Sequence, residues 1–205
     1  MQFVIKKTGI NYPVKWIESG LHNAPKKLTE RLQDVFDNIE AQRVLVAMGF
    51  CGNSVQGIKT GGFELIIPRV DDCVSLLLGS VNTRAAISAR HAAYYLTEGW
   101  LRGERNLWVD YQYTVKKYGE EQAASIVQMM FGNYRTLALL NNGVEPIERL
   151  IEKTRVIADT LGLEQIVVPA TVAYLEDLLT GPWEDNRFLI KAPWELITAL
   201  DVHLT

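Results

Sequence analysis

Cysteine is scarce in this chain, and so are the features that would direct a protein to export or into a membrane. Cys51 and Cys73 are its two cysteines, which excludes a disulfide-stapled scaffold and a four-cysteine cluster within one chain. Every apolar run is far shorter than the ~20 residues of a membrane-spanning helix. The opening residues also lack the charged, apolar and small-residue order of a signal peptide. We therefore expect a cytoplasmic protein with two free thiols and no membrane partner.

The chain also lacks a marked excess of one charge. Lys and Arg total 21 against 24 for Asp and Glu, so the net charge is −3. Because no block of Lys or Arg is present to neutralise phosphates, we expect a small-molecule substrate and no nucleic-acid partner. The hydrophobic share of 48% and the length of 205 residues are typical of a folded chain, and predict a single domain over residues 1–205. The sequence leaves homo-oligomerisation open.

Short apolar runs alternate with helical runs along the chain. The expected strands cover residues 14–17, 43–48, 63–67, 93–96, 135–140, 165–168 and 187–190. Helical spacing of apolar residues fills most of the segments between them. This order predicts an α/β fold with a mainly parallel sheet of about seven strands, flanked by helices.

The unusual chemistry of the chain lies in the loops that follow the expected strands, where α/β sheets bind their ligands. His22, Cys51 and Cys73 follow three successive strands. Two thiolates and one imidazole suit zinc or another divalent metal, and would leave a coordination position open for catalysis. The alternative is structural: both cysteines pack in the core as small apolar residues, and His22 caps the following helix.

Charged residues accompany the second cysteine. Asp71 and Asp72 are candidate general acid/base groups, or partners that orient His22. The alternative is that they cap the following helix. Arg69 is a candidate ligand for an anionic substrate group, or else the ion-pair partner of the two aspartates.

Further candidates for substrate binding lie in the same class of loops. Gly52 and Asn53 indicate a backbone that approaches a ligand closely. Trp100 is a candidate for a pocket wall, although aromatic residues more often pack in a core, and Asn142 follows the fifth expected strand. The segment around Cys51 matches neither a phosphate-binding loop nor a dinucleotide fingerprint.

Several segments resemble a family of bacterial and archaeal proteins, the domain-of-unknown-function family number one-six-three-eight. The matching segments span most of the chain and are SGLHNAPKKL (19–28), GFCGNSVQGI (49–58), IPRVDDCVSLLLGS (67–80), YYLTEGW (94–100) and LLTGPWEDNRFL (178–189). Many members begin with an extra strand and a cysteine-bearing turn. Residues 1–13 stand in its place here.

The resemblance implies a role in one-carbon metabolism, because members are often found beside corrinoid proteins and corrinoid-dependent methyltransferases. One hypothesis is a zinc-dependent enzyme of one-carbon (methyl) transfer. The alternative is a non-catalytic accessory protein that binds a corrinoid or a corrinoid protein, although the chain has no Asp-x-His-x-x-Gly segment for binding cobalamin. A redox role of the two cysteines is a third hypothesis.

Overall fold

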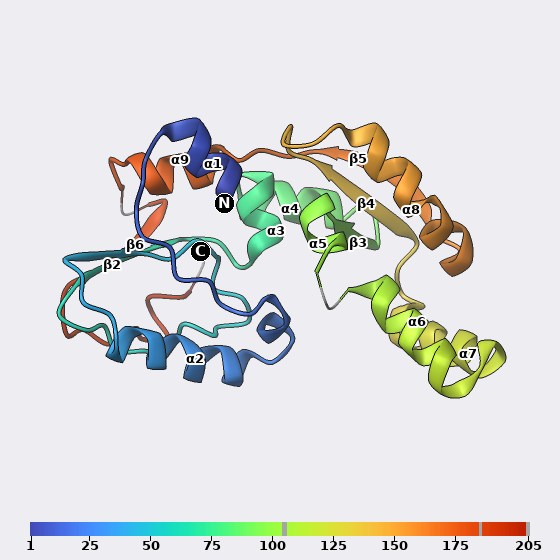
Figure 1. Cartoon of the computed structure of the whole chain (residues 1–205), viewed down its shortest axis with the longest axis horizontal. Coiled ribbons are helices and arrows are strands. Elements are labelled where there is room, and N and C mark those ends of the chain that lie inside the picture. The colour runs from blue at the N-terminus through green and yellow to red at the C-terminus, as the bar shows by residue number, and fades with distance from the viewer. Residues whose placement is uncertain (104–105, 185, 204–205) are drawn as a thin grey trace. The chain divides into compact units, whose positions relative to one another are not determined.

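The computed structural model describes residues 1–103, 106–184 and 186–203 of the chain (Figure 1). Within it, the chain divides into two units. The first comprises Met1–Arg84 together with Thr171–Thr205, and the second comprises Ala85–Ala170. In sequence, the second unit is therefore an insertion between two parts of the first.

The first unit is built on a three-stranded sheet with the order β1-β2-β6. Strand β1 (Arg43–Leu45) pairs in parallel with β2 (Glu64–Pro68). Strand β2 in turn pairs antiparallel with β6 (Phe188–Lys191), which comes from the far end of the sequence. The carboxyl ends of β1 and β2 consequently lie at the same edge of the sheet.

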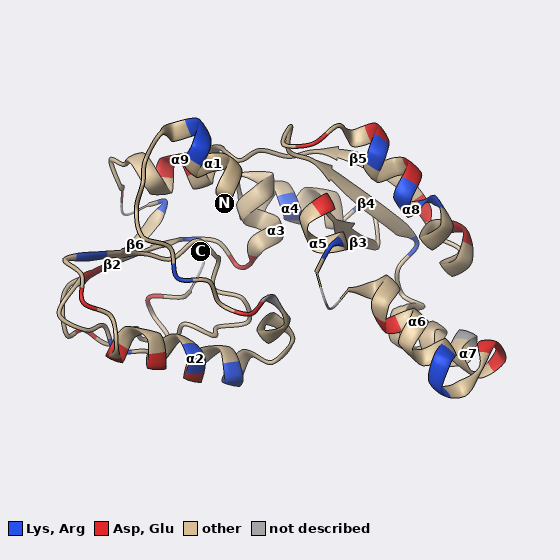
Figure 2. Ribbon diagram, in the orientation of Figure 1, with Lys and Arg blue, Asp and Glu red and all other residues tan. Residues whose placement is uncertain are grey.

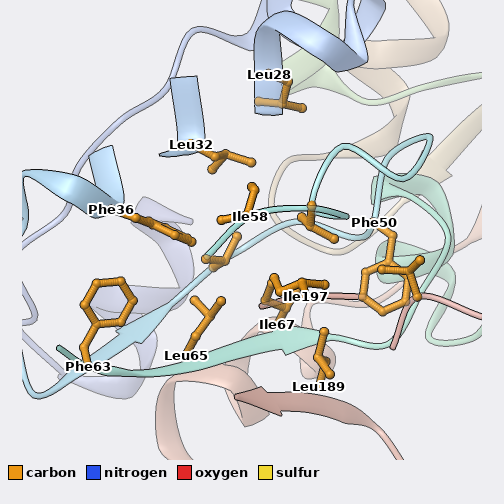
Figure 3. Packing of buried hydrophobic residues seen from close by; sticks show 13 residues of the cluster. Leu28, Leu32, Phe36, Phe50, Ile58, Phe63, Leu65, Ile67, Leu189 and Ile197 are labelled. Atoms are coloured by element: carbon orange, nitrogen blue, oxygen red, sulfur yellow. The ribbon is translucent and has the colours of Figure 1, made fainter. Parts of the chain in front are cut away.

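Strand β2 supplies apolar side chains to both faces of this sheet. Leu65 and Ile67 belong to one buried cluster (Figure 3), whereas Ile66 belongs to another. Successive side chains of a strand point to opposite faces, so a continuous apolar strand requires cover on both sides. The first face is covered by α2 (Pro25–Asp37), and the second by α1 (Gln2–Thr8), α3 (Cys73–Leu78) and α9 (Ala173–Thr180).

Helix α2 begins at Pro25, where proline suits the first helical position. It buries Leu28, Leu32 and Phe36, which are spaced by four residues and therefore share one face. A short 3-10 helix, η1 (Ser19–Asn23), precedes it.

The second unit has a fully parallel sheet with the order β3-β4-β5. Its strands are β3 (Ala93–Leu96), β4 (Thr136–Asn141) and β5 (Glu164–Pro169). Leu137 and Leu139 of β4 are fully buried in one cluster with Leu150 and Ile157 of α8 (Ile147–Leu161). Helix α4 (Val81–Ser88) leads from the first unit into the second, and the short α5 (Glu98–Leu101) follows β3.

A pair of helices follows α5 in the second unit. Helix α6 (Leu107–Tyr118) begins at Asn106, whose side chain accepts hydrogen bonds from the N–H groups of Trp108 and Val109. Gly119, with a φ of 81°, separates α6 from α7 (Glu120–Phe131). Glycine suits this position because a side chain disfavours positive φ.

Both α2 and α8 carry charges of both signs along their length (Figure 2). This pattern is typical of helices whose outer face is in water. Among the helices of residues 1–103, 106–184 and 186–203, none has both the length and the apolar character needed to cross a membrane.

The α/β class expected from the sequence is confirmed, but the single seven-stranded sheet is wrong. The described residues form six named strands in two three-stranded sheets, and β6 runs antiparallel to its neighbour. Residues 14–17, the first expected strand, form no strand, and Val14 and Trp16 are exposed. A run of β-branched and aromatic residues becomes a strand only where a neighbouring strand pairs with it, and none does so here. The expectation of a single domain stays a prediction.

Candidate functional site

The two cysteines of the chain meet in the first unit. Cys51 lies in the turn that follows β1, and Cys73 is the first residue of α3. Their Sγ atoms are 3.8 Å apart. Both thiols are free and half-buried. The structure thus brings together two of the three residues for which the sequence predicts a shared site.

A close approach of two backbone segments holds the thiols in place. The Phe50 N–H donates a hydrogen bond of 2.8 Å to the Val70 carbonyl, and the Cys51 N–H donates one of 2.7 Å to the Asp71 carbonyl. Gly49 permits this approach, because a Cβ atom at its position would lie 2.8 Å from the Val70 oxygen. Any larger residue would push the two segments apart and separate the sulfurs.

The turn that carries Cys51 has a left-handed backbone. The φ angles are 44° at Cys51, 68° at Gly52 and 63° at Asn53. Glycine and asparagine tolerate this region, whereas at a cysteine it costs of the order of 1–3 kcal/mol and is more common at functional sites. Gly52 and Asn53 are exposed, and their expected contact with substrate stays a prediction.

Protons are shared unequally between the two thiols. The two sulfurs share a contact in which either can be the donor. With Cys51 as the donor, this hydrogen bond, together with burial, raises the pKa of Cys51. The same bond, aided by a hydrogen bond from the Gly49 N–H, outweighs burial and the negative charge of Asp72, and so lowers the pKa of Cys73. The pair therefore favours a thiolate at Cys73 that is stabilised by a thiol at Cys51.

The two aspartates have different partners. Oδ1 of Asp72 accepts hydrogen bonds from the N–H groups of Val74 (2.9 Å) and Ser75 (3.0 Å), so this residue is the N-cap of α3. The Arg84 guanidinium forms ion pairs with Asp72 and, at 3.2 Å, with Asp71. Sequence reasoning missed Arg84, because it lies in another helix and no motif links it to the aspartates.

Arg69 does not form the ion pair with Asp71 or Asp72 that the sequence suggests as one alternative. In the described residues its guanidinium donates to the carbonyl oxygens of Phe188 and Asp201, each at 3.3 Å. These bonds tie the end of β2 to β6 and to the segment that follows it. The expected role of Arg69 in substrate binding stays a prediction.

His22 lies in η1 and is exposed. Across residues 1–103, 106–184 and 186–203, no three His, Cys, Asp or Glu side chains are arranged so that they could hold a metal ion together. The segment after His22 nevertheless approaches the cysteine turn, since a Cβ atom at Gly52 would lie 3.3 Å from Pro25 Cγ. The structure thus brings the two cysteines together, and the metal site predicted from the sequence stays a prediction.

Trp100 and Asn142 belong to the second unit. Trp100 packs against the core cluster around β4, and its N–H donates to Thr97 Oγ1 at 3.2 Å. The Asn142 side chain accepts a hydrogen bond of 3.2 Å from the Val144 N–H and so closes a local turn. The structure therefore shows structural contacts for both residues.

Comparison with curated proteins gave no match, and comparison with solved structures gave none either. A family model, described as "Protein of unknown function (DUF1638)", matches residues 16–179. The match includes Cys51, Cys73, Asp71, Asp72 and Arg84, and covers well over half of the sequence. The chain belongs to the DUF1638 family.

Proposed function

We propose that the chain is an enzyme in which Cys51 and Cys73 hold zinc or another thiophilic divalent metal, and that it transfers a one-carbon group. The separation of the two sulfurs supports this proposal. Ligands of a tetrahedral zinc at Zn–S distances of about 2.3 Å lie about 3.8 Å from each other, and the Sγ atoms here are 3.8 Å apart. A metal would therefore enter without a large change of the backbone.

The electrostatics of the pair favour a cation. Metal ligation requires thiolates, and the hydrogen bonds to the Cys73 sulfur lower the pKa of that group. Asp71 and Asp72 add negative charge beside the thiols, and Arg84 balances part of it. A divalent cation would in turn favour loss of the second proton from Cys51.

The neighbouring residues divide the remaining tasks. Asp72 is engaged by the N–H groups of α3, whereas the Asp71 side chain is 40% exposed. We therefore assign proton transfer to Asp71 and a positioning role to Asp72. His22 is the proposed third ligand, because the segment that follows it adjoins the cysteine turn. Its side chain would have to move toward the metal, since no three His, Cys, Asp or Glu side chains of the described residues are arranged around one point.

The one-carbon part of the proposal rests on the resemblance to proteins encoded beside corrinoid-dependent methyltransferases. Two protein thiolates leave coordination positions that a substrate can occupy, which is the general requirement for a metal that activates a nucleophile. A corrinoid, or a protein that carries one, is the methyl donor that this resemblance implies.

Metal binding by the reduced, metal-free chain tests the proposal. Addition of cobalt(II) should produce a thiolate-to-metal absorption band at one metal per chain. Zinc at about 100 times its dissociation constant should stabilise the fold by about 2.7 kcal/mol, seen as a rise in the melting temperature. Cys51→Ser and Cys73→Ser should lose both signals.

Gly49→Ala is a sharper variant, because it keeps both thiols but forces their backbones apart. It should also lose metal binding. Gly99→Ala is its control, since a Cβ atom there would lie 3.7 Å from its nearest contact. Equal thermal shifts in the parent and the cysteine variants would refute the proposal. Binding of cobalamin by metal-free protein would favour the accessory role instead.

A further inference from the structure

The reduced thiols of Cys51 and Cys73 are placed for a second kind of chemistry, which does not require the metal proposed above. A disulfide bond has an S–S length of about 2.0 Å, and the two sulfurs are already 3.8 Å apart. Closing the bond thus requires each sulfur to move by about 1 Å, which a side-chain rotation together with a small shift of the turn provides. The chain has two cysteines in all, so each has one partner within the molecule.

The surrounding backbone limits how far the thiols can separate. The hydrogen bonds from Phe50 to Val70 and from Cys51 to Asp71 join the two segments immediately beside the sulfurs. Cys73 is held at the start of α3 by the cap of Asp72. The effective concentration of one thiol at the other is therefore high.

Access from solvent is present on one side of the pair. Cys51 and Cys73 are each partly exposed as residues, burial acts on both thiols, and Gly52 and Asn53 next to Cys51 are exposed. We therefore expect a small disulfide to approach the pair from the side of Cys51, next to the exposed Gly52 and Asn53.

We propose that the Cys51–Cys73 pair is a site of thiol–disulfide exchange whose substrates are low-molecular-weight or protein disulfides. One protein thiolate attacks the substrate disulfide, a mixed disulfide forms, and the first substrate thiolate leaves. The second protein thiol loses its proton to solvent and attacks the mixed disulfide, so the second substrate thiol leaves. The pair is oxidised by two electrons, and the substrate disulfide is reduced to two thiols.

Oxidised glutathione added to the fully reduced, metal-free chain tests this proposal. After remaining thiols are blocked with N-ethylmaleimide, mass spectrometry should find the parent lighter by two hydrogens, with a peptide linking Cys51 to Cys73. In Cys51→Ser or Cys73→Ser the remaining thiol has no resolving partner. A glutathione adduct should then persist at a level roughly tenfold or more above that in the parent.

The proposal is overturned if the parent retains the glutathione adduct, or if both thiols stay reduced at concentrations that modify a free cysteine peptide. The presence or absence of the linked Cys51–Cys73 peptide in the parent protein tests the proposal even if a cysteine variant fails to fold. Zinc binding of the reduced parent is measured separately. A chain that forms the disulfide but binds no zinc refutes the metal centre alone, and the reverse result refutes the exchange alone.

Discussion

Cys51 and Cys73 are chemically different, although they touch. Either sulfur can donate to the other, but the backbone N–H of Gly49 adds a donor on the side of Cys73 and so favours Cys73 as the acceptor. A thiolate that accepts two hydrogen bonds is stabilised relative to its thiol. We therefore expect the two thiols to differ in their reactivity toward electrophiles.

This difference predicts the pH dependence of thiol alkylation in the reduced, metal-free chain. Because hydrogen bonds from Cys51 and Gly49 lower the pKa of Cys73 below its ordinary value of 9.0, its reaction with iodoacetamide should reach half of its maximal rate below pH 9.0. Cys51→Ala removes the S–H donor, so the midpoint should move to higher pH. Cys51→Ser keeps a hydroxyl donor and should move it less. A parent midpoint at or above 9.0 would contradict the assignment.

Single residues also explain why one part of the site could be read from the sequence and another could not. Cys51 and Cys73 follow neighbouring parallel strands, so topology alone predicts that they approach each other. Arg84 reaches Asp71 and Asp72 from a different helix, and its position depends on the angle at which that helix leaves α3. No local pattern in the sequence records that angle.

Helix α3 connects the site to the fold. It is six residues long, too short to be stable alone. Its N-terminus is held by the Asp72 cap, and Leu76 and Leu78 are buried. Asp72 thus stabilises the N-terminus of α3 and, in doing so, helps to position Cys73, the first residue of the helix.

Replacement of the cap predicts a graded loss of stability. Asp72→Ala removes the acceptor for the N–H groups of Val74 and Ser75, and should lower the free energy of unfolding by about 0.5–2 kcal/mol. Asp72→Asn keeps a capping oxygen but loses the charge paired with Arg84, so its loss should be smaller. Urea unfolding of the reduced proteins measures both values. Equal losses in the two variants would show that the ion pair, and not the cap, stabilises this end of α3.

Most strands are predictable because they are short apolar runs, and in β2 and β4 Gly, Pro or Asn marks where the run ends. The failures have a common cause. Residues 14–17 have the composition of a strand but no partner, and the expectation of a mainly parallel sheet does not identify β6 as the strand that pairs antiparallel with β2. Pairing and direction depend on contacts between distant parts of the sequence, which composition does not report.

The chain as a whole has separate cores. Leu65 is fully buried in a cluster of the first unit and Leu137 in a cluster of the second. Burial is equally complete at both positions. Leu65 and Leu137 are therefore equivalent positions at which to test whether a substitution in one unit also destabilises the other.

Truncation of these leucines should have local effects on stability. Leu65→Ala and Leu137→Ala should each cost about 2–5 kcal/mol. In hydrogen–deuterium exchange, Leu65→Ala should speed exchange in β1, β2 and β6, and Leu137→Ala in β3, β4 and β5. Faster exchange of both sheets in either variant would show instead that the two units unfold as one.

The insertion of the second unit within the first has a consequence for synthesis on the ribosome. Every residue of Ala85–Ala170 has been translated before Thr171 is added, whereas the first unit lacks β6 until Phe188–Lys191 follow. The nascent chain therefore carries β2 without its partner strand β6 at a stage when the whole second unit has already been translated and can begin to fold. An unpaired edge presents free N–H and C=O groups with which a strand of another chain can pair. We therefore expect misassembly to be favoured in the interval between these two points of translation.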